Sequence, residues 1–180
     1  MNRFGQSCLL ARRLAESGVR YISVYYTSSN NQPWDTHSDH YKRHPELCAD
    51  SDQASAALIS DLKQRGLLED TLVVWTGEFG RTPYAQGGGK GRNHWPYGYP
   101  ITFIGGPIRQ ASKGVFGACG PDSVATAGSS TPQENRIAAL LALGIWPFAQ
   151  ESYNVSDVPG ATTEANAAAL VKQRQLGIAS

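Results

Sequence analysis

The amino-acid sequence predicts an α/β protein, with a mostly parallel sheet flanked by helices, from the order and character of its apolar segments. In the first 76 residues a helical segment twice precedes a β-branched one, which is the pattern of parallel strands joined by crossover helices. The second β-branched segment, residues 71–76, is largely apolar, as in strands buried on both faces. Polar residues follow both strands, so we expect the functional site at the carboxyl edge of the sheet.

Glycine and proline set the bounds of the first elements. Apolar residues recur at helical spacing over residues 5–17, and Gly18 then ends the helix. Residues 19–26 are β-branched and aromatic, which predicts a strand. Pro45 suits the first turn of a second helix, which Gly66 closes before the second strand. Each predicted strand therefore runs into a polar loop.

The rest of the chain alternates loops with short regular segments. Residues 77–98 are rich in glycine and aromatic side chains, and we expect them to form a long active-site loop before a strand at 99–104. Residues 107–130 are small and polar, which predicts mostly irregular chain. The remaining predicted elements are a capping box at 131–134, the helix 135–143 that it opens and an Ala-rich helix at 163–176.

Composition excludes several classes of function. The 180 residues, 41% hydrophobic and 17% charged, suit a single α/β domain over residues 1–180. A formal net charge of +1 gives no reason to expect nucleic acid or an anionic membrane as a partner. No apolar run approaches the roughly 18 residues of a membrane span, and the three cysteines lack the spacing of a thiolate metal site. The function must therefore be sought in local clusters of polar residues.

Four residues on three separate loops are candidate metal ligands. Asp35 and His37 lie two apart, so in an extended loop their side chains point to the same side and can share one ion. Glu78 directly follows the second strand between nearby glycines, which let backbone approach a bound group. His94 lies in a glycine-rich loop that a metal ion, with stacking by Trp95, would order. The simpler alternatives are a turn capped by Asp35 and solvated histidines.

Basic residues next to these candidates favour an anionic substrate. Arg81, Lys90 and Arg92 would form a rim that accepts phosphate or sulfate, although Arg81 could instead pair with Glu78 in a structural ion pair. Metal-assisted hydrolysis of a charged ester fits this combination. Mixed carboxylate and imidazole ligands favour zinc or manganese, whereas calcium prefers more oxygens. His40 and His44 are expected to be solvated, with His40 close enough to support His37.

The motifs resemble a bacterial family of sulfatase-like proteins, domain of unknown function 1501, in the alkaline phosphatase and sulfatase superfamily. The similar segments are Trp34-Asp35-Thr36-His37, residues 71–83, Asn93-His94-Trp95-Pro96 and residues 6–14. The resemblance implies an alkaline phosphatase-like fold with metal ligands at the carboxyl edge of the sheet, and a small-molecule or glycan ester as substrate. It also implies a divalent metal (zinc, manganese or calcium) and a periplasmic or secreted location.

The resemblance assigns residues as well. It places Asp35, His37 and His94 in one metal site, and Glu78-Phe79 where better-known members have Asp-His for a second metal, which removes one imidazole ligand. Neither the hydroxyl or modified cysteine nucleophile of the superfamily nor an export signal has an equivalent in the sequence. We therefore expect the chain to be the C-terminal portion of such a protein, with an incomplete version of the fold.

Two other interpretations stay open at this point. The chain could be a non-catalytic module that retains the fold and binds a metal, or that holds a glycan or a partner protein through the aromatic residues Trp95, Tyr97 and Tyr99. It could also be an incompletely folded fragment, which would unfold without cooperativity. A meeting of His94 with Asp35 and His37 is the structural feature that the hydrolase interpretation requires.

Overall fold

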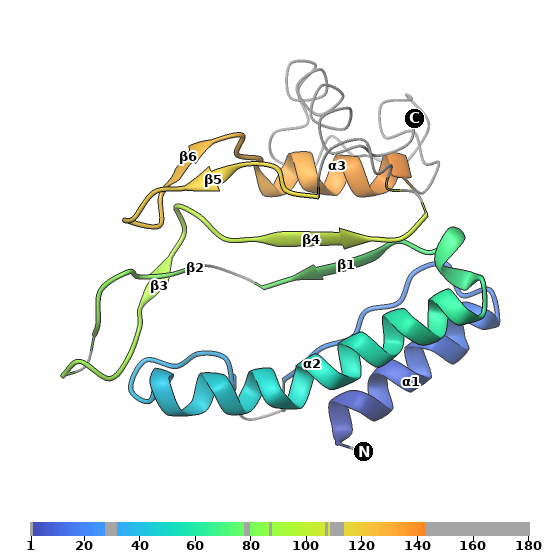
Figure 1. The fold of residues 1–180 in the computed structure, drawn as a ribbon, viewed down its shortest axis with the longest axis horizontal. Helices are drawn as coiled ribbons and strands as arrows, with labels where there is room; N and C mark the ends of the chain where they lie inside the picture. Colours follow the sequence, from blue (N-terminus) through green and yellow to red (C-terminus); the bar gives the residue numbers. More distant parts are fainter. Residues whose placement is uncertain are drawn as a thin grey trace, which may run out of the picture. The chain divides into compact units, whose positions relative to one another are not determined.

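A computed structural model of the chain describes residues 2–27, 32–77, 80–86, 88–106, 108 and 114–142. The chain divides into two compact units, of which the first comprises Met1–Glu69 with Gly77–Tyr99 and the second comprises Asp70–Thr76 with Pro100–Ser180. Helices and short antiparallel strand pairs make the described part a mixed α/β protein (Figure 1). The expectation of one domain over residues 1–180 stays a prediction, and the predicted helix 163–176 lies outside the described residues.

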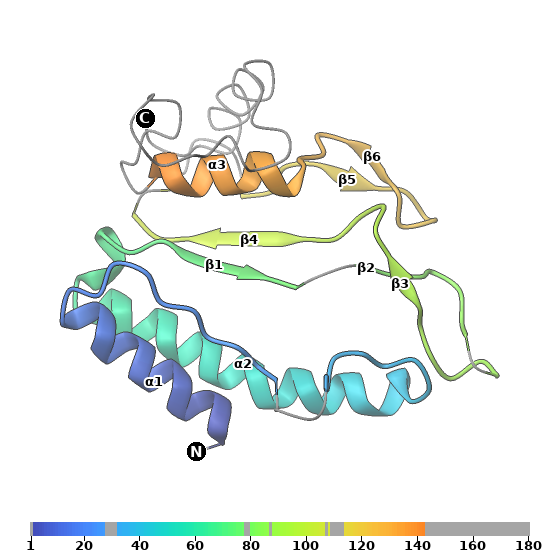
Figure 2. The same cartoon turned by 180° about the vertical axis from the view of Figure 1, so that it is seen from behind.

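The first unit is built on two helices, α1 (Arg3–Glu16) and α2 (His40–Gln64), which lie side by side in Figures 1 and 2. Their apolar residues recur at helical spacing, so each helix buries one face against the other. Burial of a leucine-sized side chain contributes about 1.5–3 kcal/mol, which outweighs intrinsic helix propensity. Among the described residues of this unit, the buried apolar side chains are Cys8, Ala11, Leu47 and Leu62.

An ion-pair network also connects the two helices. The buried Arg12 of α1 places its Nε 2.8 Å from Oδ2 of Asp61 in α2. Arg65, the C-cap of α2, binds the other oxygen of Asp61 at 2.7 Å and reaches Glu16 at 3.2 Å. Gly66 follows with a φ of +72°, a conformation that L side chains rarely adopt, so the predicted glycine stop is confirmed. A single-turn helix, η1 (Leu67–Glu69), comes next.

The segment 19–27 is extended but pairs with no strand among the described residues, so the strand predicted at 19–26 is wrong. Of its three tyrosines, Tyr21 and Tyr25 are exposed, and Tyr26 packs against neighbouring rings. The ring centroid of Tyr26 lies 4.9 Å from that of Phe4 in α1 and 5.6 Å from that of Trp34. The Tyr26 hydroxyl donates to Asp50 of α2 at 3.1 Å. These contacts hold the segment against α1 and α2 without a strand partner. The contact with Tyr26 also fixes Trp34, the residue before Asp35.

Helix α2 begins at His40, five residues before Pro45, which therefore lies within the helix and not in its first turn as predicted. The added turn is held by a contact that sequence order does not reveal. The N–H of His40 donates to the carbonyl of Lys90 at 2.9 Å, and the N–H of Arg43 donates to the carbonyl of Asp39 at 2.9 Å. A distant loop thus satisfies a backbone donor at this helix end.

The predicted active-site loop contains a short hairpin. Strands β2 (Gly80–Arg81) and β3 (His94–Trp95) pair antiparallel, with Arg81 directly opposite His94. Beyond β2 the hairpin continues, because the N–H of Thr82 donates to the carbonyl of Asn93 at 3.0 Å. The hairpin gives this glycine-rich segment regular backbone partners.

In the second unit, β1 (Val73–Thr76) pairs antiparallel with β4 (Ile101–Ile104), with Val73 opposite Ile104 and Thr76 opposite Ile101. The predicted mostly parallel sheet is therefore wrong for the described residues, whose strands form three separate antiparallel pairs. The order of helices and strands does not fix strand direction here, because residues 77–99, which belong to the first unit, separate β1 from β4 in the sequence. The third pair joins β5 (Ala118–Cys119) to β6 (Ala125–Ala127).

The second unit also contains α3 (Pro132–Ala142), whose first turn is the predicted capping box. The N–H of Glu134 donates to Oγ1 of Thr131 at 3.2 Å, and the N–H of Thr131 donates to the Glu134 carboxylate at 2.6 Å. Pro132 is the first helical residue, so both start signals are confirmed. Of the described helices, none combines the length and the apolar character needed to cross a membrane.

Candidate metal centre

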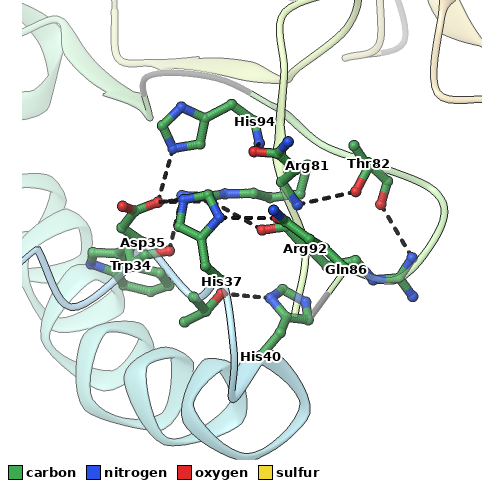
Figure 3. A network of polar contacts seen from close by, with 11 residues as sticks. Trp34, Asp35, His37, His40, Arg81, Thr82, Gln86, Arg92 and His94 are labelled. Atoms are coloured by element: carbon green, nitrogen blue, oxygen red, sulfur yellow. Dashed lines mark hydrogen bonds and ion pairs between the residues drawn. The ribbon is translucent and has the colours of Figure 1, made fainter. Parts of the chain in front are cut away.

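The loop before α2 positions Asp35 and His37 through the residue between them. Thr36 is only 3% exposed, and its hydroxyl lies 2.7 Å from Nδ1 of His40 in the first turn of the helix. Its carbonyl accepts from the N–H of Arg92 at 3.2 Å. With Thr36 anchored to the helix, the side chains of Asp35 and His37 meet each other, with Nε2 of His37 2.9 Å from Oδ1 of Asp35 (Figure 3).

The β2–β3 hairpin brings two further side chains to the same carboxylate. Residues directly opposite each other in an antiparallel pair share a face, so Arg81 and His94 project together. Nε2 of His94 lies 2.8 Å from Oδ1 of Asp35, and Nη1 of Arg81 lies 2.9 Å from the same oxygen. Figure 3 shows His37, His94 and Arg81 converging on Asp35. Of the three loops predicted to meet, the structure thus brings two together, that of Asp35 and His37 and that of His94.

Three of the four predicted metal ligands can hold one ion. One ligand atom from each of Asp35, His37 and His94 lies within 4.8 Å of the others. The fourth predicted ligand, Glu78, lies outside the described residues. A carboxylate with two imidazoles is a donor set that suits zinc and similar divalent ions, and three protein ligands leave a position open in catalytic zinc sites. The residues present therefore fit a divalent metal.

The charge of Asp35 suits a cation. Partial burial of the carboxyl acts to raise its pKa, but hydrogen bonds from His94 and Arg81, with the nearby charge of His37, hold that pKa below its usual value. The side chains of Asp35, His37 and His94 are 28%, 40% and 39% exposed. An ionised carboxylate and two partly exposed imidazoles leave the cluster accessible from solvent.

The predicted anion-binding residues have different surroundings. Besides Asp35, Arg81 donates to the carbonyl of Trp34 at 3.2 Å. Arg92 donates to the hydroxyl of Tyr41, and its guanidinium carbon lies 5.4 Å from the centre of that ring. Both arginines are thus held by protein acceptors, whereas Lys90 is exposed. An anion-binding role for these three residues stays a prediction.

His40 and His44 form a second imidazole pair beside the cluster, so the prediction that both are solvated is wrong. Their ring centroids lie 4.5 Å apart, and the His44 ring stands edge-on to Trp34 at 5.3 Å. Desolvation, followed by repulsion from neighbouring positive groups, lowers the pKa of both histidines. Their separation of four residues on one helix was the available signal, because residues at that spacing are neighbours.

Sequence reasoning missed Gln86. Its Oε1 lies 3.1 Å from Nδ1 of His37, although the two residues are 49 positions apart. The residue type carries no ligand character, and nothing in the local sequence predicts which loop residue would reach His37. The contact depends on how the hairpin sits against the loop of Asp35.

The chain is thus a mixed α/β protein whose first unit brings one carboxylate and two imidazoles together, from the loop before α2 and from strand β3. The chain belongs to the family described as protein of unknown function (DUF1501), whose family profile matches residues 1–166. This match confirms the family part of the resemblance. No curated protein and no solved structure matches the chain.

Proposed function

We propose that the chain supplies a divalent-metal site to a hydrolase of the alkaline phosphatase and sulfatase type, which acts on a sulfate or phosphate ester. The observation that carries the proposal is the single carboxylate oxygen of Asp35, which lies within 2.9 Å of one nitrogen from each of His37 and His94. The proposal assigns the chain to the C-terminal portion of such an enzyme, with an alkaline phosphatase-like fold and a periplasmic or secreted location.

Within this proposal Asp35, His37 and His94 hold the ion. A divalent ion bound there would polarise an ester oxygen and stabilise the charge that develops on it. Arg81 keeps Asp35 ionised and fixes the direction of its carboxylate through the 2.9 Å contact. The exposed Lys90, with the guanidinium groups of Arg81 and Arg92, would attract the anionic ester to this end of the unit.

The donor set also bears on which metal is expected. Two imidazole nitrogens and one carboxylate oxygen favour zinc or manganese. Calcium takes six to eight oxygen ligands, of which Asp35 supplies one or two, so calcium would depend on further oxygens such as those of Glu78. Zinc is therefore the first ion to test.

The test of this proposal is metal-dependent turnover by the protein with whatever sequence flanks this chain in the cell. Chelator-treated protein is assayed on aryl phosphates and aryl sulfates with added zinc, manganese or calcium. We expect turnover that requires one of these ions and is lost in Asp35→Asn. The matched control is Asp39→Asn, an exposed carboxylate near the site, which should retain turnover. Absence of turnover with every ion and both ester classes would contradict the hydrolase proposal.

An aromatic cluster supports a second candidate function, a glycan-binding module. Trp95 stands edge-on to Tyr84 at 5.9 Å and to Tyr97 at 4.9 Å, and both tyrosines are well exposed. Consecutive strand residues point to opposite faces, so Trp95 faces away from its neighbour His94. Calorimetric titration with oligosaccharides would detect binding that Trp95→Ala abolishes. The exposed Trp75 of the second unit provides the control, because Trp75→Ala should leave that binding unchanged.

A further inference from the structure

Gln86 contacts one of the candidate ligands from the side opposite the carboxylate. The His37 ring lies between two acceptors, with Nε2 2.9 Å from Oδ1 of Asp35 and Nδ1 3.1 Å from Oε1 of Gln86. Figure 3 shows this arrangement, in which the Gln86 amide reaches the far nitrogen of the ring. The proposed hydrolysis assigns no role to Gln86, so this contact calls for a separate explanation.

The contact with Gln86 favours hydrogen on Nδ1 of the His37 ring. An amide oxygen has lone pairs and no hydrogen, so a hydrogen bond at this position requires Nδ1 of His37 to donate. A neutral imidazole with hydrogen on Nδ1 has its free lone pair on Nε2. That nitrogen is the one that faces Asp35 and the candidate metal position. Metal-binding histidines usually donate their second N–H to a carboxylate or carbonyl, and such partners fix the tautomer.

The backbone holds Gln86 firmly in this position. Its N–H donates to the carbonyl of Gly91 at 2.8 Å, and the N–H of Gly91 donates back at 2.9 Å. Gly91 in turn lies directly against the loop, because a Cβ at Gly91 would stand 1.6 Å from the carbonyl oxygen of His37. The hairpin therefore holds Gln86 in register with His37.

We infer that Gln86 is a positioning residue, which accepts a hydrogen bond from Nδ1 of His37 and thereby directs Nε2 toward the metal. This inference rests on the proposed metal site. It adds to that site a residue that touches neither metal nor substrate and that the close packing of the hairpin on the backbone of His37 holds in place.

The experiment compares three variants of the full chain. Gln86→Met keeps the length of the side chain without the acceptor, and Gln86→Glu keeps the acceptor. Gln53→Met, at an exposed position of α2, is the matched control. Long-range proton–nitrogen NMR identifies the hydrogen-bearing nitrogen of His37, in the metal-free protein at alkaline pH and after zinc addition. Calorimetry measures the zinc dissociation constant of each protein.

In the metal-free protein Asp35 and Gln86 compete for the single hydrogen of neutral His37, so we expect both tautomers in the wild type, in Gln86→Glu and in Gln53→Met, and hydrogen on Nε2 alone in Gln86→Met. The zinc dissociation constant of Gln86→Met should rise about 10–100-fold, which is the usual effect of removing such a partner. Gln53→Met should leave the zinc dissociation constant unchanged, and Gln86→Glu should bind zinc at least as tightly as wild type, because a carboxylate acceptor raises the basicity of the imidazole. Equal tautomers and equal zinc affinity in wild type and Gln86→Met would overturn the role of Gln86.

The measurements also separate this inference from the proposed function. If the wild type does not bind zinc, the proposed metal site fails, and the tautomer of the metal-free protein still decides the role of Gln86. If Gln86→Met does not fold, Gln86→Glu decides instead. Loss of the Nδ1 hydrogen in folded Gln86→Glu would overturn the inference, and its retention would support it.

Discussion

Two pairs of histidines stand close together in the first unit, and their surroundings differ. The rings of His37 and His94 are 5.1 Å apart and inclined by 40°, and those of His40 and His44 are 4.5 Å apart and inclined by 32°. The first pair shares the carboxylate of Asp35, whereas the second pair has no carboxylate contact among the described residues. Similar ring geometry therefore accompanies opposite electrostatic environments.

His40 and His44 show how a pair of imidazoles is surrounded when no carboxylate of the described residues contacts it. His44 stands against the Trp34 ring, and its Nδ1 is buried without a hydrogen-bond partner. His40 is held by the hydroxyl of Thr36. Desolvation lowers the pKa of both rings and favours their neutral forms. The groups that surround an imidazole pair, more than its position in the sequence, thus determine whether the pair can bind a cation or has a structural role.

Replacement of Asp35 should have the largest effect, because it removes the difference between the two pairs. In Asp35→Asn we expect zinc affinity to fall by about 100-fold or more, since the one carboxylate that the described residues bring to the cluster is lost. The half-buried Arg81 also loses its counter-charge, which should lower the free energy of unfolding by about 1–3 kcal/mol. Calorimetry and urea denaturation measure both. Asp39→Asn is the matched control, and equal zinc affinity in the two variants would contradict the assignment.

Gly91→Ala should disturb the packing that brings the first pair together. A Cβ at Gly91 would lie 1.6 Å from the carbonyl oxygen of His37, so backbone must move, at a cost of about 1–3 kcal/mol in the free energy of unfolding. Zinc affinity should fall as well. Gly77→Ala is the control, because a Cβ at Gly77 has no neighbour within 4 Å. Equal urea midpoints for the two variants would show that the hairpin does not pack on this loop.

The second pair should make folding sensitive to acid. The folded pKa of His44 is lowered, so as the pH falls through the ordinary histidine pKa the unfolded chain binds a proton that the folded chain does not. Stability is therefore greatest above that pKa and declines below it. In His44→Phe the decline should be shallower than in wild type. Urea denaturation in the presence of chelator, from pH 8 to pH 5, measures the two slopes, and identical slopes would contradict a neutral, desolvated His44.

Lys90→Ala should have the smallest effect. Lys90 is exposed and its side chain has no assigned role in holding the cluster, so zinc affinity should stay within about twofold of wild type. Affinity of the zinc-loaded protein for inorganic phosphate or sulfate should fall by less than about tenfold, as expected for one exposed charge. Lys42→Ala, another exposed lysine, controls for net charge. Unchanged phosphate and sulfate affinity in Lys90→Ala would remove Lys90 from the predicted anion rim.

The sequence predicted the candidate metal ligands better than the residues that hold those ligands in place. Asp35, His37 and His94 could be selected because carboxylate and imidazole are metal ligands by residue type. The support from Gln86 could not, because an amide becomes informative only when a distant loop places it against a ring. The carboxylate contact of Arg81 was likewise unpredictable, since Glu78 was nearer in sequence than Asp35.

The same contrast applies to the fold. The capping box of α3 and the glycine that ends α2 could be predicted from the sequence, because each depends on interactions within a few residues. Strand direction was not, because β1 pairs with β4 only after the chain has passed through the first unit. The extended segment 19–27 has strand-like composition, but a strand also needs a backbone partner, which its composition cannot specify.

The zinc stoichiometry of the chelator-stripped protein, determined by calorimetry and elemental analysis, decides whether the triad is a metal site. Wild type and His44→Phe should each bind one zinc ion per chain at the triad of Asp35, His37 and His94, and His94→Ala should bind none. Wild-type protein that binds no stoichiometric ion, or His94→Ala that binds zinc as tightly as wild type, would show that these three side chains do not form a metal site.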